Sequence, residues 1–314
     1  MNSDIRDVVM IGSGPSALTA AIYTTREDID TVIYEKSTIG GLASTTDMID
    51  NYPGFPDGVT GMELAEKFEK QVVKFGATVD FGEVSDVKRD GDYLVVEVDG
   101  KPVVTRSVLV ATGSDYNRLG IPGESELYGR GAHYCATCDG AFYKGKKLAV
   151  VGGGNSAIQE AIFLTRYATH IDLIVRSSIK ASEILQEDLK KYIEDGRITV
   201  HLETKPLEIV HDNGRATGVV VENPDDKFTL DVSAVFIFVG LIPNSGFLKD
   251  TEIELDDYGM VKTNIKLETS LPGVFASGDV RSGATRQVVS AAGEGAVAAI
   301  SIREYLDDMR RRGL

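Results

Sequence analysis

The sequence predicts an α/β protein with two Rossmann-like dinucleotide-binding domains, each a parallel sheet with helices plus a small antiparallel sheet insertion. Two glycine-rich turns, at 12–17 and 152–157, each lie inside a strand, turn, helix and strand pattern. Each is followed by alternating apolar and polar residues broken by turn motifs, over 83–106 and 201–233. The length of 314 residues exceeds what one hydrophobic core usually takes and favours two domains.

Composition narrows the class of protein. The chain is 42% hydrophobic and 26% charged, which is ordinary for a globular protein. Its formal charge of −15 repels polyphosphate chains, so nucleic acid is not expected as a partner. No apolar run approaches the roughly 20 residues that a bilayer helix needs, and the N-terminal stretch lacks the pattern of a secretory signal. We therefore expect a soluble cytoplasmic protein with no membrane partner.

The first glycine turn, in "DVVMIGSGPSALTAAIY", is typical of a phosphate-binding turn. Gly12, Gly14 and Ala17 have the GxGxxA spacing. Gly12 makes the tight turn, Gly14 lets the backbone approach a pyrophosphate, and Ala17 allows the helix to lie close to the strand. The phosphates are then expected at the helix N-terminus. Glu35 ends the next strand, 23 residues after Gly12, where an acid that binds the ribose is expected.

The pattern recurs in "KKLAVVGGGNSAIQEAIFL", where Gly152, Gly154 and Ala157 have the same spacing. A loop that only turns a corner is the alternative for either motif alone. Two motifs, each inside a complete unit, favour two dinucleotide sites.

The remaining elements follow from apolar runs and turn signals. A C-terminal helix of small residues is expected to begin near Arg286 and to end in a basic turn. Because no stretch is rich in Pro, Gly or Ser, the domain crossings must be short, and we place them near 115 and 244. Further apolar strands are expected at 107–114, 234–244 and 273–281.

The stretch "HYCATCDGAFY" holds the only two cysteines of the chain, Cys135 and Cys138. A structural zinc site needs four ligands, and only His133 is close in sequence, so no metal is expected. Buried inert cysteines are a second possibility. Redox chemistry explains the C-x-x-C spacing best, because one thiolate can attack a partner disulfide while the other resolves the mixed disulfide. Asp139 is then either a general acid or base for the thiols or the cap of a turn, and spacing alone favours neither role.

Such a dithiol must itself be reduced by two electrons. Two dinucleotide sites provide the means, because a flavin can take a hydride from a nicotinamide and pass electrons to a disulfide.

Six stretches occur in order along the chain: "GSGPSALTAAIY", "DNYPGFPDGVTGMEL", "VLVATGS", "YCATCDGAFYKGKKLAVVGGGNSA", "FVGLIPN" and "LPGVFASGDVRSGATRQVVSAAGEG". By these stretches the chain resembles the low-molecular-weight thioredoxin reductases along essentially its whole length. The resemblance implies FAD and NADPH as cofactors, thioredoxin or a thioredoxin-like protein as partner, and a homodimer. It implies a discontinuous FAD-binding domain, 1–115 with 245–314, and an NAD(P)H-binding domain, 116–244, that carries the cysteine pair.

The resemblance also implies roles for single residues. Cys138 would lie against the flavin, Cys135 would exchange with the partner protein, and Asp139 would protonate. Arg286 and the two residues after it would set a helix N-terminus against the flavin ring, where the positive end of the helix dipole favours the reduced anion. The residues implied around FAD are Gly12, Gly14, Pro15, Ser16, Ala17, Glu35, Lys36, Gly40, Gly41, Asn51, Ala111, Thr112, Gly113, Gly278, Asp279, Arg286, Gln287 and Val288. Those implied around NADPH are Gly152, Gly154, Asn155, Ser156, Ala157, Arg176 and Lys180.

One departure concerns the electron donor. Where the family has a His-Arg-Arg run and a further Arg to hold the 2'-phosphate of NADPH, this chain has "IVRSSIKAS", which keeps Arg176 and replaces the last Arg by Lys180. No acid follows the strand to take the ribose hydroxyls of NADH, so NADPH stays the first choice. NADH, reduced ferredoxin or another flavin are alternative donors, and glutaredoxin-like or peroxiredoxin-linked proteins are alternative partners. A flavin-binding redox sensor that signals through the cysteine pair is the alternative from a different class.

Overall fold

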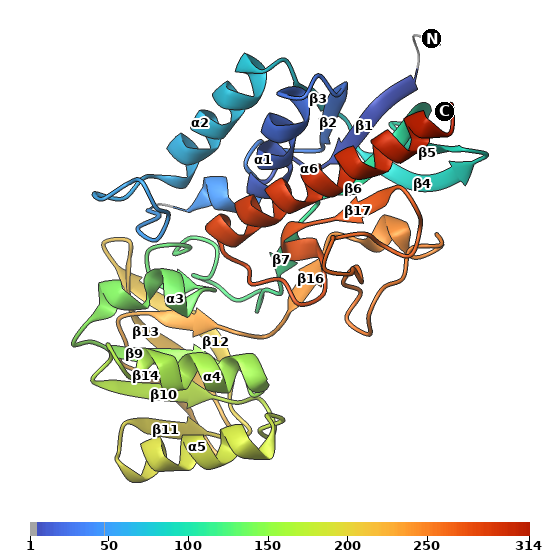
Figure 1. Cartoon of the computed structure of the whole chain (residues 1–314). Coiled ribbons are helices and arrows are strands. Elements are labelled where there is room, and N and C mark those ends of the chain that lie inside the picture. Colours follow the sequence, from blue (N-terminus) through green and yellow to red (C-terminus); the bar gives the residue numbers. More distant parts are fainter. Residues whose placement is uncertain (1–4, 47) are drawn as a thin grey trace. The chain divides into compact units, whose positions relative to one another are not determined.

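The computed structural model describes residues 5–46 and 48–314. The chain forms two compact units, one of Met1–Asp115 with Ile242–Leu314 and one of Tyr116–Leu241. Their elements are shown in Figure 1, and each unit is described by itself. The two passages between the units carry the short strands β7 (Ser114–Tyr116) and β16 (Leu241–Pro243), which pair with each other.

The first unit is built on a parallel sheet with crossover helices. Strands β1, β2 and β3 pair in parallel, and helices α1 and α2 connect them in turn. Pro15 at the first position of α1 suits a helix start, because it has no N–H that needs an acceptor. The bounds are β1 Ile5–Ile11, α1 Pro15–Thr25, β2 Thr31–Glu35, η1 Gly41–Thr45, α2 Gly61–Lys74 and β3 Thr78–Phe81.

Strand β6 (Lys101–Val110) joins this parallel sheet to the predicted antiparallel insertion. It pairs in parallel with β1 and β17 (Val274–Ala276), and in antiparallel with β5 (Tyr93–Val98), which pairs with β4 (Val84–Asp90). The order across the sheet is β3-β2-β1-β6-β5-β4, with β17 beside β6. The period-two alternation therefore predicted the insertion correctly.

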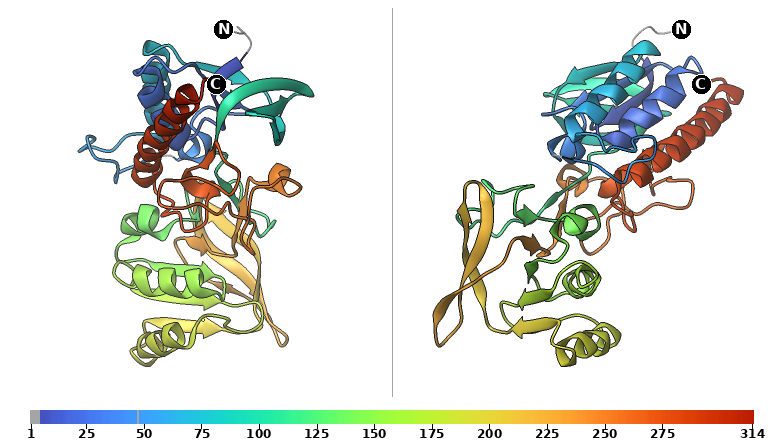
Figure 2. Two further views of the ribbon diagram at one scale, coloured as in Figure 1. Left: turned by 45° about the vertical axis from the view of Figure 1, so that its right-hand side comes forward. Right: turned by 90° about the vertical axis from the view of Figure 1, so that its left-hand side faces the viewer.

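Helix α6 (Val288–Arg311) lies beside α1 on one face of the sheet, as Figures 1 and 2 show. Small residues allow this approach, because a Cβ at Gly295 would lie only 2.2 Å from the carbonyl oxygen of Ser16. The other face is covered by the segment between β16 and α6, which includes η3 (Gly246–Leu248) and η4 (Gly278–Val280). Close contact between α1 and α6 holds the glycine turn of 12–17 near η4.

The second unit repeats this plan. Its five parallel strands have the order β11-β10-β9-β15-β8. Residues on β9 alternate, so that Leu148 and Val150 contact the helices while Ala149 and Val151 contact the antiparallel sheet on the other face. The bounds are β8 Ala132–His133, α3 Ala136–Asp139, η2 Gly140–Tyr143, β9 Lys147–Val151, α4 Asn155–Leu164, β10 His170–Ile174, α5 Glu183–Glu194, β11 Ile198–His201, β12 Lys205–Asp212, β13 Arg215–Glu222, β14 Lys227–Leu230 and β15 Val235–Ile237.

The predicted fold class is confirmed in both units, each of which carries a parallel sheet, crossover helices and an antiparallel insertion. Among the helices of 5–46 and 48–314, none is long and apolar enough to cross a membrane.

Candidate active site

The first glycine turn is compact on one side and open on the other. The Gly12 N–H donates to the carbonyl of Tyr34 at 2.8 Å, and its φ of +92° lies in the region that favours glycine. A Cβ at Gly12 would lie 2.7 Å from the carbonyl oxygen of Ala111, so the turn requires glycine. A Cβ at Gly14 would meet no atom within 4 Å, which leaves this side of the backbone accessible to a phosphate group.

A second pair of glycines lies against this turn. The Gly40 N–H donates to the carbonyl of Ser13 at 2.9 Å, and a Cβ at Gly41 would be 3.7 Å from the Cα of Gly14. The structure therefore brings together the glycines that the sequence placed around the FAD phosphates.

Glu35 has more partners in the protein than the sequence indicated. Its Oε2 accepts hydrogen bonds from the Ser13 N–H at 2.8 Å and the Ser13 hydroxyl at 2.7 Å. Its Oε1 accepts from the Ser37 N–H at 2.8 Å and the Ser37 hydroxyl at 3.3 Å. Because a carboxylate has about four acceptor positions, a ribose hydroxyl has to replace one of the serine hydroxyls. Glu35 thus also holds the glycine turn in place.

The loop at 277–281 meets the start of α1. The hydroxyls of Ser16 and Ser277 are 2.5 Å apart. Glu294 on α6 accepts from the Gly278 N–H at 2.7 Å and forms an ion pair of 2.6 Å with Arg281. Sequence reasoning missed Glu294, whose contacts depend on the approach of α6 to η4.

Asp279 is a carboxylate without a donor. Burial raises its pKa from 3.8 to about 6, Arg286 opposes this change in pKa, and Glu294 adds to it. No donor among the described residues forms a hydrogen bond to it. A buried carboxylate in this position is suited to accept hydrogen bonds from the hydroxyls of a bound ligand. Together with the open backbone at Gly14, this residue makes the site fit FAD.

A hydrogen bond connects two segments predicted near the flavin ring. The Asn51 side-chain amide donates to the Gln287 side-chain carbonyl at 3.1 Å. Gln287 forms a capping box with Ser290 at the start of α6, where Val288 is the first residue. Arg286 precedes it with a φ of +59°, a conformation that residues other than glycine seldom adopt.

The other residues predicted for FAD lie on the same edge of the sheet. Ala17 is buried in α1, and Lys36 directly follows β2. The Ala111–Gly113 turn is tied to Asn244, whose carbonyl accepts from the Thr112 hydroxyl at 2.7 Å.

The second glycine turn, in the other unit, has the same construction. Gly152 has a φ of +142°, and a Cβ there would lie 2.4 Å from the carbonyl oxygen of Phe238. A Cβ at Gly154 would again meet no atom within 4 Å. Asn155, Ser156 and Ala157 begin α4.

The loop after β10 folds against this turn. The Lys180 N–H donates to the carbonyl of Gly153 at 2.7 Å, and the Ser182 N–H donates to the Asn155 side chain at 2.8 Å. Arg176 and Lys180 are exposed, and neither forms an ion pair within the described part of the chain. Ile174 and Val175, which stand where the family has His and Arg, are buried. The residues present therefore provide two free cations for a phosphate group.

The cysteines form a disulfide with a Cα–Cα distance of 5.3 Å. Cys135 is the N-cap of α3, where its Sγ accepts a hydrogen bond from the Cys138 N–H at 3.1 Å. Both cysteines are partly exposed. The pair is therefore bonded and accessible, as thiol–disulfide exchange requires.

Asp139 does not cap the turn that follows it, because its side chain makes no capping hydrogen bond. Its Oδ2 lies 3.0 Å from Nδ1 of His133, whose Nε2 lies 2.7 Å from the Tyr143 hydroxyl. Burial and then the charge of Asp139 raise the pKa of Tyr143 to about 12, so this hydroxyl keeps its proton at neutral pH. The Asp139 side chain is therefore held by His133 and does not cap this turn, and its acid–base role stays a prediction.

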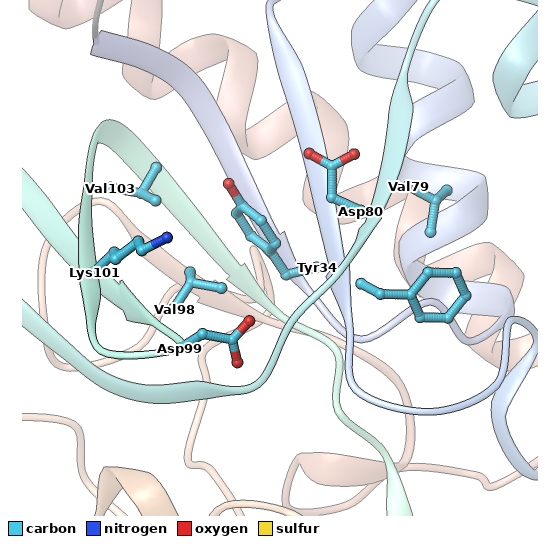
Figure 3. Close-up of a pocket in the computed structure, with 8 residues that line it drawn as sticks. Tyr34, Val79, Asp80, Val98, Asp99, Lys101 and Val103 are labelled. Carbon is cyan, nitrogen blue, oxygen red and sulfur yellow. The ribbon is translucent and has the colours of Figure 1, made fainter.

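A separate cavity of about 560 Å³ opens in the first unit between β3 and the β5–β6 hairpin (Figure 3). It contains none of the residues predicted for the cofactors or the disulfide. The residues around it are Tyr34, Val79, Asp80, Phe81, Val98, Asp99, Lys101 and Val103.

Comparisons with known proteins agree with this arrangement of two glycine turns and a disulfide. The model of the family described as "Pyridine nucleotide-disulphide oxidoreductase" matches residues 6–295. The chain belongs to this family. As a member, it is an oxidoreductase whose chemistry connects a pyridine nucleotide with a disulfide.

Relatives within the family are named thioredoxin reductases. The thioredoxin reductase of Bacillus subtilis is 37% identical over 311 residues, which cover 98% of this chain and 96% of that one. The crystal structure of thioredoxin reductase from Streptococcus pyogenes superposes with a TM-score of 0.92 at 36% identity, covering 98% of this chain and all of that one. The NADPH-dependent thioredoxin reductase 3 of Arabidopsis thaliana is 39% identical over 313 residues, covering 96% of this chain and 58% of that protein.

Proposed function

We propose that the protein is a thioredoxin reductase in which the Cys135–Cys138 disulfide transfers electrons to thioredoxin. The observation that carries the proposal is an accessible disulfide whose second cysteine precedes an aspartate held by a buried histidine. The similarity to thioredoxin reductases over 98% of the chain supports it.

The enzyme uses FAD and NADPH. We assign FAD to the domain of 1–115 and 245–314, which carries the Gly12–Ala17 turn and Asp279, and NADPH to 116–244, which carries Arg176 and Lys180. Bound FAD would supply the two-electron chemistry that connects NADPH with the disulfide. The backbone at Gly14 and Gly154 leaves room for the two pyrophosphates. Asp279 accepts hydrogen bonds from hydroxyls of FAD, and Arg176 with Lys180 binds the 2'-phosphate of NADPH.

Cys135 is the thiol that exchanges with thioredoxin. Once the disulfide is reduced, the Cys138 N–H is positioned to donate to a thiolate at Cys135, which favours the ionised form. The Cys135 thiolate attacks the disulfide of thioredoxin, forms a mixed disulfide and releases one sulfur of the partner. Cys138 then attacks Cys135, so that the internal disulfide reforms and the second sulfur leaves.

Asp139 moves the protons of this exchange. It follows Cys138 directly in the chain, and its side chain is 18% exposed. It accepts a proton from a thiol as the thiolate forms and returns it to a leaving sulfur.

The partner and the assembly are part of the same proposal. The similarity to thioredoxin reductases supports thioredoxin or a thioredoxin-like protein as the partner. We further propose a homodimer that works in the cytoplasm without nucleic acid or membrane partners, consistent with the charge of −15.

Anaerobic stopped-flow spectroscopy of the FAD-loaded protein tests the two halves of the reaction separately. NADPH should bleach the flavin absorbance quickly in the wild type and in Cys135→Ser, whereas only the wild type should reduce thioredoxin. Bleaching by NADH and not by NADPH would reverse the choice of nucleotide. Absence of turnover with every thioredoxin, together with intact flavin reduction, would favour a redox sensor.

A further inference from the structure

His133 is a buried residue that neither the cofactor sites nor the disulfide exchange uses. Its side chain is 2% exposed, and it lies on β8 opposite Phe236 of β15. The ring stacks on Phe236 at 5.1 Å and meets Tyr143 edge-on at 5.2 Å. Aromatic packing alone therefore holds the plane of the imidazole from two sides.

Both ring nitrogens have polar partners. Nδ1 lies 3.0 Å from Oδ2 of Asp139, and Nε2 lies 2.7 Å from the Tyr143 hydroxyl. An ionised carboxylate only accepts hydrogen bonds, so Nδ1 of His133 donates to Asp139. Where Nε2 carries no proton, the Tyr143 hydroxyl donates to it. The three groups therefore form one directed hydrogen-bond chain that ends at Asp139.

The same chain also accommodates protonated Asp139. The carboxylic acid can then donate to Nδ1, while Nε2–H donates to the Tyr143 oxygen, because a phenol hydroxyl both donates and accepts. In either state the His133–Asp139 and His133–Tyr143 hydrogen bonds remain, which lowers the cost of changing the charge of this carboxyl group. A ring that served only to fill space would need none of these contacts.

We infer that His133 is a positioning residue for Asp139, and that Tyr143 acts through His133. This inference rests on the proposed function, in which Asp139 transfers protons during disulfide exchange. In one cycle the Cys135 and Cys138 thiols lose two electrons and two protons as their S–S bond forms. The partner disulfide takes up both electrons and both protons as its bond breaks. His133 orients the carboxyl group through which one of these protons passes and changes no oxidation state itself.

Two substitutions of His133 distinguish a role in orienting Asp139 from a role in filling space. In His133→Asn, the amide nitrogen occupies approximately the place of Nδ1 and can still donate to Asp139. In His133→Gln, the longer amide reaches the place of Nε2, so it contacts Tyr143 and leaves Asp139 without its donor. We expect His133→Gln to lower kcat for thioredoxin about tenfold, a part of what a general acid–base group contributes. His133→Asn should retain kcat within about threefold of wild type, with KM for thioredoxin and flavin bleaching by NADPH unchanged in both variants.

A double-mutant cycle with Asp139→Asn shows whether His133 acts through the aspartate. If it does, His133→Gln should cause no further loss of kcat in the Asp139→Asn background. Equal losses in His133→Asn and His133→Gln, or losses that multiply with that of Asp139→Asn, would overturn the inference and assign His133 to packing. If thermal unfolding shows that His133→Gln does not fold, Tyr143→Phe replaces it in the cycle. Tyr143→Phe should likewise cause no further loss of kcat in the Asp139→Asn variant.

The cycle also distinguishes failure of the inference from failure of the proposed function. Asp139→Asn with wild-type turnover would remove the acid–base role and with it the proposed mechanism. A slow Asp139→Asn beside a fast His133→Gln would retain that mechanism and refute only the role of His133. Tyr192→Phe, at a partly buried tyrosine of α5 in the same unit, is the control for loss of a hydroxyl and should match wild type.

Discussion

Replacing Asp279 by Asn should stabilise the FAD-free protein while weakening its binding of FAD. Burial raises the pKa of Asp279 from 3.8 to about 6, which means that the folded protein disfavours the charged form of this side chain. A difference of about 2 in pKa corresponds to about 3 kcal/mol of stability at pH 7. The neutral amide avoids this cost, but it lacks the charge that strengthens hydrogen bonds from ligand hydroxyls.

The sign of the pH dependence follows from proton binding. Between about pH 4 and pH 6 the folded protein binds more protons at Asp279 than the unfolded chain does, because its pKa is higher in the folded state. The free energy of unfolding of the wild type therefore falls as pH rises through this window, and the full cost is present at pH 7. Asp279→Asn lacks this contribution, so the difference between the two proteins should shrink towards pH 4.

Urea unfolding of the FAD-free proteins at pH 4, 5.5 and 7, followed by circular dichroism, measures this difference. Asp257→Asn, at an exposed aspartate of the same unit, is the matched control and should change stability little at any pH. Equilibrium titration with FAD at pH 7 should give a Kd about tenfold higher for Asp279→Asn. The reasoning is refuted if Asp279→Asn is no more stable than wild type at pH 7, or if its advantage is the same at pH 4.

Three further changes test other parts of the structure. Gly12→Ala should destabilise the first unit by about 2 kcal/mol or more, because the φ of Gly12 is +92° and a Cβ would lie 2.7 Å from a carbonyl oxygen. The variant should also fail to retain FAD on gel filtration, and normal retention of FAD would contradict this account. Glu124→Gln should lower stability by about 2 kcal/mol in thermal unfolding. Glu124 is 1% exposed, and its carboxylate accepts hydrogen bonds from two backbone N–H groups at 2.9 and 2.7 Å and from a tyrosine hydroxyl at 2.6 Å. Glu126→Gln, whose side chain is 75% exposed, is its control, and equal losses in both would be inconsistent with a role for burial. Arg176→Gln should raise KM for NADPH about tenfold and leave KM for NADH unchanged in steady-state kinetics, and a parallel rise in both would exclude contact with the 2'-phosphate.

The sequence by itself determined the features that depend on residues close together in the chain. The two glycine turns, the C-x-x-C pair and the alternating strands were predicted correctly, because φ preferences and side-chain periodicity are properties of local sequence.

Only the tertiary structure decided how the polar side chains are used. Glu35 was predicted from its position to bind ribose, but its oxygens already accept hydrogen bonds from two serines that the fold brings to it. Glu294 reaches the 277–281 loop only because α6 lies against α1. Asp139 was equally consistent with a cap until β8 and α3 brought it to His133. Hydrogen-bond partners and desolvation depend on which segments meet in space. For Glu35 and Glu294 these segments are distant in sequence, and for Asp139 they are joined by a turn whose path does not follow from the spacing of the residues.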